Sequence, residues 1–447
     1  MKIAGALASI MASVALTGTC VTDWSIDRDW CLSVSVDGRS RAFVVAPPPC
    51  IEVDNERYEG LPVFDPGKYE CFRGRQFKGV YALGCSVKFA LVPESVRIRD
   101  AKGVTLLQGV DYEIDGAWGL VGRLENGHID ASDSVVADYA YLQRRIDSVV
   151  LDERGTLVYR IGTPHVATPV PPETAACERR ILNVYVDART KRLTDDNVFP
   201  VLEASYPRQQ TIDPYGNTVA SRLIPKTFSK LRNGGKVRIL AWGDSVTETL
   251  DYYLADKSKR WQEVFVSRLR PMFPMAEIEL VTAGWDGHYS SDFLKAPPDS
   301  PKNFRRAVLD AKPDLVVSEF LNDFSCYQTA DSMERTYGDA YLAQFEKKGI
   351  EWIILTPHYS RLEQMKFISQ KGCDDDTRPY VSCLRDFARK HDIALADASK
   401  RWGRLWRQGI PYMTLLCNDI NHPDPRGLAI FADALMEDVF TAPAETR

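Results

Sequence analysis

Four short polar stretches in the second half of the chain contain side chains that can act together in catalysis. The tripeptide Gly-Asp-Ser at 243–245 offers a hydroxyl, and Asn322 offers an amide N–H. Near the C-terminus, Asp419 and His422 stand three residues apart in the pattern D-x-x-H-P. Cleavage of an ester by serine requires a hydroxyl, a base within hydrogen-bonding reach and a carboxylate that orients the base. These residue types therefore predict acyl transfer.

The chemical type of each residue indicates its role. We expect Ser245 to be the nucleophile, His422 the base and Asp419 the acid that reaches back to orient His422. A developing oxyanion needs hydrogen-bond donors, and we expect them to be the backbone N–H groups of Ser245 and Gly287 and the side-chain N–H of Asn322. Gly287 suits this role because no Cβ obstructs the approach of a ligand. The reaction needs no metal and no organic cofactor.

Each of these motifs is weak by itself. Gly, Asp and Ser are common turn formers, and Asn-Asp is more often a turn or a helix cap than an oxyanion donor. A D-x-x-H stretch before proline is usually a loop feature. The conjunction favours catalysis, because the motifs follow one another in order and each comes after a predicted strand.

The elements that must position these residues form an alternating pattern. From residue 237 onward, continuous apolar segments alternate with amphipathic helical ones, which predicts a parallel sheet covered on both faces. Ligands bind beyond the carboxyl ends of the strands in such sheets, where the four polar stretches lie. The predicted strands are 237–242, 278–283, 315–320, 352–357 and 393–397, and the predicted helices include 258–270 before Pro271, 333–349 and 381–392.

In this order the motifs resemble those of the SGNH (GDSL-type) hydrolase family. The resemblance covers about residues 225–447 and implies a three-layer α/β/α fold with a parallel, flavodoxin-like sheet. It also implies the same roles: a serine nucleophile at Ser245, a histidine base at His422 with Asp419 as orienting acid, and an oxyanion hole completed by the glycine and asparagine of the second and third motifs. A G-x-S-x-G elbow is absent, which argues against the α/β-hydrolase fold.

The sequence departs from the family pattern at three places, of which Val246 in the first motif, in place of leucine or isoleucine, is a minor change. Phe320 stands where the third motif usually has glycine, and Thr282 replaces an asparagine often found in the second. Gly284 and Gly287 compete for the oxyanion role. Gly287 is preferred because the residues that follow it, His-Tyr-Ser at 288–290, are similar to the family's Gly-x-Thr-Ser run.

Three further residues are candidates for substrate contacts. Trp285 and Tyr289 flank the predicted site, and aromatic faces of this kind stack on sugar rings. Packing beneath the loops is the alternative for both. His358 follows the fourth predicted strand, so it can meet a substrate there or make a structural hydrogen bond.

The N-terminal half follows a different pattern. Between about residues 31 and 224, apolar and polar residues alternate in short segments separated by turn signals, which predicts an antiparallel sandwich or barrel. We therefore expect an accessory β-rich domain at 20–224 and a catalytic domain at 225–447.

The first residues have the layout of a secretory signal peptide, which we place at 1–19. The apolar run is shorter than the ~20 residues that a membrane-spanning helix needs, and no later segment reaches that length either. Lipidation of Cys20 is the alternative to simple cleavage. The protein is therefore expected to be secreted or periplasmic. The net charge of −5 gives nucleic-acid binding no electrostatic support.

Together these features predict a secreted serine esterase. Export and an accessory β domain resemble carbohydrate esterases, so the expected substrate is an acetylated saccharide. The alternatives are a lipid esterase and a non-catalytic carbohydrate-binding protein on an esterase scaffold. The chain has ten cysteines, and their pairing stays open, although Cys373 and Cys383 bracket a polar loop and are candidates for a disulfide.

Overall fold

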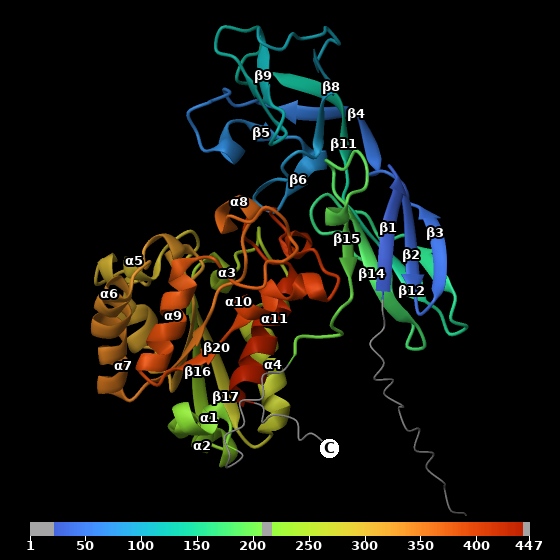
Figure 1. Ribbon diagram of the computed structural model, residues 1–447. Coiled ribbons are helices and arrows are strands. Elements are labelled where there is room, and N and C mark those ends of the chain that lie inside the picture. The colour runs from blue at the N-terminus through green and yellow to red at the C-terminus, as the bar shows by residue number, and fades with distance from the viewer. Residues whose placement is uncertain (1–21, 208–216, 441–447) are drawn as a thin grey trace, which may run out of the picture.

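The structure is a computed structural model, and it describes residues 22–207 and 217–440 (Figure 1). The predicted signal peptide at 1–19 and Cys20 lie outside these residues. Within the described part of the chain, no helix is both long and apolar enough to cross a membrane.

A five-stranded parallel sheet forms the centre of the C-terminal half. The strand order is β17-β16-β18-β19-β20, and each neighbouring pair is parallel. The strands match the five apolar segments predicted from the sequence. Their bounds are Lys236–Gly243 for β16, Glu277–Gly284 for β17, Leu315–Glu319 for β18, Glu351–Leu355 for β19 and Ala394–Ala396 for β20.

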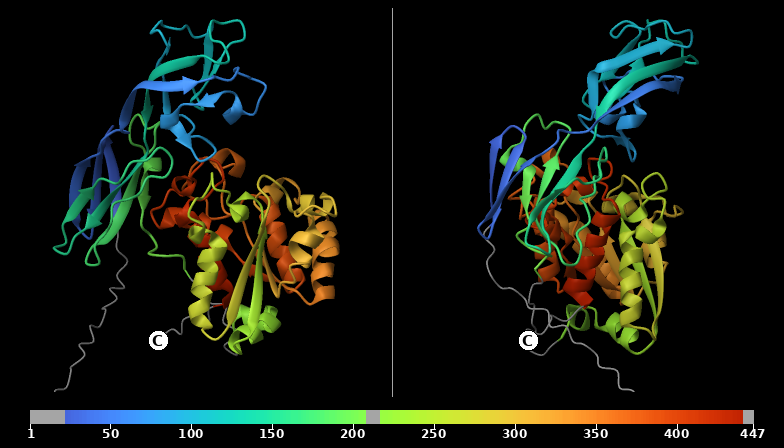
Figure 2. Two further views of the ribbon diagram at one scale, coloured as in Figure 1. Left: turned by 180° about the vertical axis from the view of Figure 1, so that it is seen from behind. Right: turned by 90° about the vertical axis from the view of Figure 1, so that its right-hand side faces the viewer.

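Helices cover both faces of this sheet, as Figures 1 and 2 show. Alternate residues of β16 point to opposite faces, because side chains of a strand alternate. Ile239 packs with one set of helices and Leu240 with the other. The first set is α1 (Val219–Leu223), α2 (Pro225–Arg232), α4 (Trp261–Met272) and α11 (Pro425–Leu435). The second includes α6 (Ala330–Met333), α7 (Ala343–Lys348) and α9 (Pro379–Lys390). The result is the predicted α/β/α arrangement.

Two helices differ from the sequence prediction. Helix α4 does not end at Arg270 but continues through Pro271 to Met272, because the N–H of Phe273 still bonds to the carbonyls of Leu269 and Arg270. The segment predicted as one helix at 333–349 contains a wider π-helical stretch, Glu334–Leu342, before α7.

The lower part of the N-terminal half is an antiparallel β-sandwich, as predicted. One sheet has the order β1-β2-β3 and the other β13-β12-β14-β15. Leu32 and Val34 from the first sheet share a core with Val149 and Leu182 from the second. The strands are β1 (Thr22–Arg28), β2 (Cys31–Val36), β3 (Arg39–Val44), β12 (Arg145–Leu151), β13 (Leu157–Arg160), β14 (Arg179–Val186) and β15 (Val198–Pro200).

A second β unit lies above the sandwich in Figure 1 and has a separate hydrophobic core. Its main sheet has the order β4-β11-β8, and two small sheets, β5-β10-β9 and β6-β7, complete it. The described part of the N-terminal half thus contains two large hydrophobic cores. The strands are β4 (Cys50–Glu59), β5 (Arg75–Gln76), β6 (Tyr81–Ala82), β7 (Cys85–Ser86), β8 (Leu91–Asp100), β9 (Tyr112–Asp115), β10 (Leu120–Arg123) and β11 (Ser134–Leu142).

The nine cysteines among the described residues are all unpaired. Cys373 and Cys383, the candidates for a disulfide, are therefore not joined in this structure. Cys373 is buried in the C-terminal half and Cys383 is half-buried on α9.

Candidate active site

Ser245 stands at the sharp turn that follows β16. A side chain at Gly243 would place its Cβ 2.2 Å from the carbonyl oxygen of Glu319 and 2.2 Å from Oγ1 of Thr247, so only glycine fits there. Helix α3 (Ser245–Glu248) begins directly after the turn, and its N-cap is Asp244, which accepts the N–H of Val246. Ser245 therefore comes almost directly after the strand, because the chain turns at Gly243 into a helix that Asp244 caps.

The hydroxyl of Ser245 contacts the imidazole of His422. Oγ of Ser245 lies 3.1 Å from Nε2 of His422, although 177 residues separate them in the chain. Both are largely buried, at 5% and 8% exposure. This geometry suits proton transfer from the hydroxyl to the ring.

The surroundings of His422 keep its ring neutral. Burial lowers its pKa to about 4, so the ring is uncharged and able to accept a proton at pH 7. One face stacks on Tyr253 with the ring centroids 4.3 Å apart. Nδ1 is buried and has no hydrogen-bond partner among the described residues.

Asp419 does not bind His422 in this structure. Its carboxylate accepts two hydrogen bonds from the guanidinium of Arg144, at 2.5 and 3.0 Å, and one from the backbone N–H of Lys88 at 3.3 Å. A forked pair of charged donors competes well against a single ring N–H for a carboxylate. The hydrogen bond between Asp419 and His422 that the D-x-x-H spacing predicts is absent. The acid is bound to residues of the β-rich half instead.

The predicted oxyanion donors lie on the next two loops. Gly287 follows β17 with a positive φ of 71°, and nothing lies within 4 Å of where its Cβ would be. Asn322 follows β18, where it donates its backbone N–H to Asp244 at 2.9 Å and its side-chain N–H to the carbonyl of His288 at 3.3 Å. These bonds join the serine, glycine and asparagine loops to one another.

Two buried aspartates support these loops. Asp244 accepts the N–H groups of Val246 and Asn322, and Asp323 accepts the N–H of Ser290 and the hydroxyl of Tyr337. Burial raises the pKa of Asp244 to about 7 and that of Asp323 to about 6. Their positions agree with a bracing role rather than with proton transfer to a substrate.

The three candidate substrate residues have different surroundings. Trp285 is half-buried and stacks on His288 with ring centroids 4.0 Å apart. Tyr289 is half-buried at the N-cap of α5 (Ser290–Lys295). His358 is completely buried, and its Nε2 lies 2.7 Å from the carbonyl oxygen of Asn421. His358 thus supports the loop of His422 and, in this structure, is not placed to meet a substrate.

Sequence reasoning missed three residues that touch the site. Arg144 and Lys88 come from the β-rich half, and Tyr253 comes from the segment after α3. No motif marks Arg144, which lies 275 residues from Asp419. Phe320, which stands where the family pattern has glycine, packs its ring edge-on against buried Trp242.

Comparisons with known proteins give matches among solved structures alone: no family model and no curated protein matches the sequence. One match is a putative lipolytic protein of the G-D-S-L family from Desulfitobacterium hafniense, with 17% identity, 45% of this chain and 99% of that chain covered, and a TM-score of 0.33. A second is an acetylxylan esterase from Geobacillus stearothermophilus, with 19% identity, 47% and 97% covered, and a TM-score of 0.36.

A third match is a two-domain esterase active on acetylated mannans, with 16% identity and a TM-score of 0.38. It covers 51% of this chain and 56% of that chain. Proteins of the SGNH/GDSL type, which the sequence motifs resemble, are thus among the structures found.

Proposed function

We propose that this protein is a serine ester hydrolase. The observation that carries the proposal is the 3.1 Å contact between Oγ of Ser245 and Nε2 of His422. The contact lies at the carboxyl edge of a parallel sheet, where such folds bind their ligands. The neutral state of His422 adds support, because a base must be unprotonated to accept the proton of the hydroxyl.

The reaction proceeds through an acyl-enzyme. Nε2 of His422 takes the hydroxyl proton as Oγ of Ser245 attacks the ester carbonyl. The N–H groups of Ser245, Gly287 and Asn322 are the proposed donors to the resulting oxyanion. His422 then gives its proton to the leaving alcohol, and water activated by His422 releases the acid.

Asp419 is the proposed orienting acid of this mechanism. The role requires its carboxylate to leave Arg144 and to accept a hydrogen bond from Nδ1 of His422. That nitrogen is buried without a partner within the described residues, so a carboxylate would have no other acceptor to replace there. A carboxylate there would fix the tautomer of the ring and stabilise its protonated form.

The proposed substrate is an acetylated saccharide met outside the cell or in the periplasm. The predicted signal peptide supports export, and the half-buried rings of Trp285 and Tyr289 offer apolar faces beside the site. Two of the similar structures are named for activity on acetylated mannans and for acetylxylan esterase activity.

The decisive test is hydrolysis of 4-nitrophenyl acetate by the wild type and by Ser245→Ala. We expect the substitution to reduce kcat by about 10³-fold or more, because it removes the nucleophile. Ser267→Ala is the matched control, since Ser267 is an exposed serine on α4 whose hydroxyl bonds to the carbonyl of Val264. Equal rates for wild type and Ser245→Ala would reject the hydrolase and favour a binding protein.

The substrate class needs a second measurement. Acetate release is measured for acetylated mannan, acetylated xylan and an acyl glycerol, each with wild type and Ser245→Ala. Faster release from the polysaccharides supports the proposal. Faster release from the acyl glycerol would identify a lipid esterase instead.

A further inference from the structure

An ion pair joins the β-rich half to the loop that carries His422. Arg144 lies in the two-residue connection between β11 and β12, and Asp419 lies three residues before His422. Two guanidinium nitrogens of Arg144 bond to the two carboxylate oxygens of Asp419. Both residues are buried, with 5% and 6% exposure. Such a pair is specific in geometry, and removing one partner leaves a buried charge without compensation.

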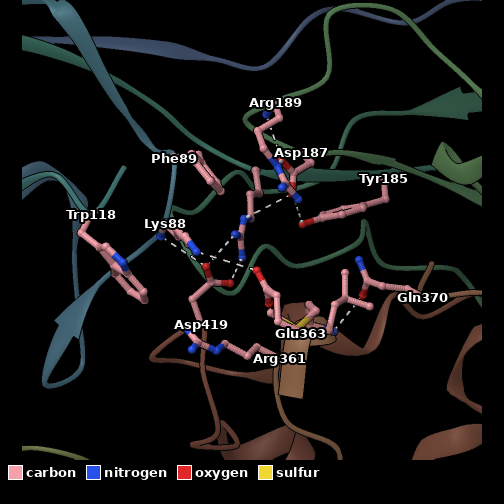
Figure 3. A pocket seen from close by; sticks show the side chains of 13 residues that line it. Lys88, Phe89, Trp118, Tyr185, Asp187, Arg189, Arg361, Glu363, Gln370 and Asp419 are labelled. Atoms are coloured by element: carbon pink, nitrogen blue, oxygen red, sulfur yellow. Dashed lines mark hydrogen bonds and ion pairs between the residues drawn. The ribbon is translucent and has the colours of Figure 1, made fainter. Parts of the chain in front are cut away.

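The groups that hold this pair come from the β-rich half. Nε of Arg144 lies 3.8 Å from the carboxylate of Asp187, which also accepts the hydroxyl of Tyr185. The backbone N–H of Lys88 is the third donor to Asp419. Figure 3 shows Asp419 pointing into a pocket with Lys88, Asp187 and Tyr185 around it. The acid is thus directed into the contact between the two halves.

His422 lacks the partner that its chemistry requires. When Nε2 accepts the serine proton, Nδ1 must carry the other ring proton, and a buried donor without an acceptor is costly. The side-chain oxygen of Asn418 accepts the N–H groups of Ile420, Asn421 and His422, and these bonds fold the segment into a tight turn. Asp419 therefore belongs to the same tight turn as His422.

These contacts lead to an inference that rests on the proposed function. We propose that Arg144 is a positioning residue that withholds Asp419 from His422, so that the β-rich half restrains the hydrolase and opening of this ion pair completes the catalytic triad. Arg144 touches neither the substrate nor the reacting atoms. It acts through Asp419 alone.

Several other ionisable groups lie against the ring or the loop of His422. Tyr252 and Tyr253 lie against its ring, with centroids 6.4 and 4.3 Å away. His358 lies behind its loop, and Cys417 bonds through Sγ to its carbonyl oxygen. These groups are neutral near pH 6, because the pKa values of the tyrosines and of Cys417 are raised and that of His358 is lowered, in each case mainly by burial.

The test is the substitution Arg144→Met in the full chain, with hydrolysis of 4-nitrophenyl acetate as the assay. Released Asp419 should orient His422, and we expect kcat to rise by about tenfold or more. The acid limb of kcat/KM should move upward by about 1–3 pH units, because a carboxylate beside the ring favours its charged form. Arg144→Met/Asp419→Asn should lose both effects.

A control separates this effect from a general loosening of the two halves. Arg404→Met removes a different ion pair between the halves, with Glu203, that does not involve Asp419. It should leave kcat and the acid limb as in the wild type. Unchanged or slower hydrolysis by Arg144→Met, with the acid limb in its original place, would overturn the inference.

A measurement without substrate keeps the inference separate from the proposed function. The pKa of the His422 ring is followed by NMR in wild type and Arg144→Met, with His422→Gln to assign the signal. A higher pKa in Arg144→Met supports the inference even if no ester is cleaved, and an equal pKa refutes it. If Arg144→Met does not fold, Arg144→Lys replaces it, since its single ammonium cannot hold both oxygens and should raise the pKa partway.

Discussion

At the scale of single residues, burial of His422 has two opposing effects on its ability to act as a base. Burial keeps the ring neutral down to low pH, which preserves the base, but it also makes the ring a weak acceptor of protons. Ser245 and Tyr253 hold the ring in place from two sides. What the ring lacks is a charge to stabilise its protonated form.

The pH dependence of hydrolysis should reveal this environment. His422 must be neutral to act, so activity is lost as pH falls through its pKa, which burial lowers to about 4. We expect the fall of kcat/KM that reports protonation of His422 to be centred near pH 4. A fall centred near pH 6.5, the ordinary histidine value, would contradict the description of this site.

Substitution of Asp419 tests its role as the proposed acid. Asp419→Asn should keep the fold, because the amide retains one acceptor for Arg144. It should reduce kcat by about 10²- to 10⁴-fold, because turnover then loses the fraction of molecules in which Asp419 has left Arg144 and reached His422. The measurement is steady-state hydrolysis together with far-UV circular dichroism. Asp433→Asn, which changes a half-buried aspartate paired with Arg268, is the matched control. Turnover close to wild type in Asp419→Asn would discard Asp419 as the orienting acid.

At the scale of the elements, close contact between β16 and β18 determines where the serine stands. The turn after β16 passes so near the carbonyl of Glu319 that no side chain fits at Gly243. Asp244 then caps α3 and holds the asparagine loop at the same time. The position of the hydroxyl is therefore a property of three adjoining elements and not of the turn alone.

A methyl group at Gly243 should break this arrangement. We expect Gly243→Ala to lower Tm and to abolish hydrolysis, because its Cβ would lie 2.2 Å from backbone and side-chain oxygens. Gly103→Ala is the comparison, since Gly103 also lies in a turn but has nothing within 4 Å of the added Cβ. Its positive φ should cost only about 1–2 kcal/mol. Equal losses of stability in the two variants would show that the packing described at Gly243 is wrong.

The elements of the C-terminal half were predictable from sequence because their signals are local. Continuous apolar runs gave the five strands, and the rule that polar loops gather at the carboxyl edge placed the predicted site there. The helix ends were less predictable, since the backbone bonds of Phe273 decide how far α4 runs past Pro271. The chemistry of Ser245 and His422 follows from residue type, whereas their distance needed the structure.

At the scale of the whole molecule, polar contacts tie the two halves together at several points. Asn183 donates to the carbonyl of Gly409, Arg426 to that of Pro169, and the thiol of Cys85 to that of Asn418. The sequence could not predict these contacts or the ion pair of Arg144 with Asp419, because no local pattern links residues hundreds of positions apart. The two cores of the N-terminal half were also hidden, since both have the same alternating pattern.

These contacts predict how the protein unfolds. A buried ion pair and several buried hydrogen bonds would be lost if one half unfolded alone, so we expect one cooperative transition in urea. Tryptophan fluorescence and far-UV circular dichroism should give coincident curves. Two separate transitions would show that the halves are only loosely associated.

The short passage between the two β units has a mechanical consequence. Only Gln143 and Arg144 separate β11 from β12, and consecutive Cα atoms lie 3.8 Å apart, so the passage has almost no slack. Arg145 donates to the carbonyls of Ala46 and Pro47, which lie in the connection between β3 and β4. If the upper unit tilts against the sandwich, the guanidinium of Arg144 must therefore move with it. The angle between the two β units is therefore coupled, through Arg144, to the position of the Asp419 carboxylate.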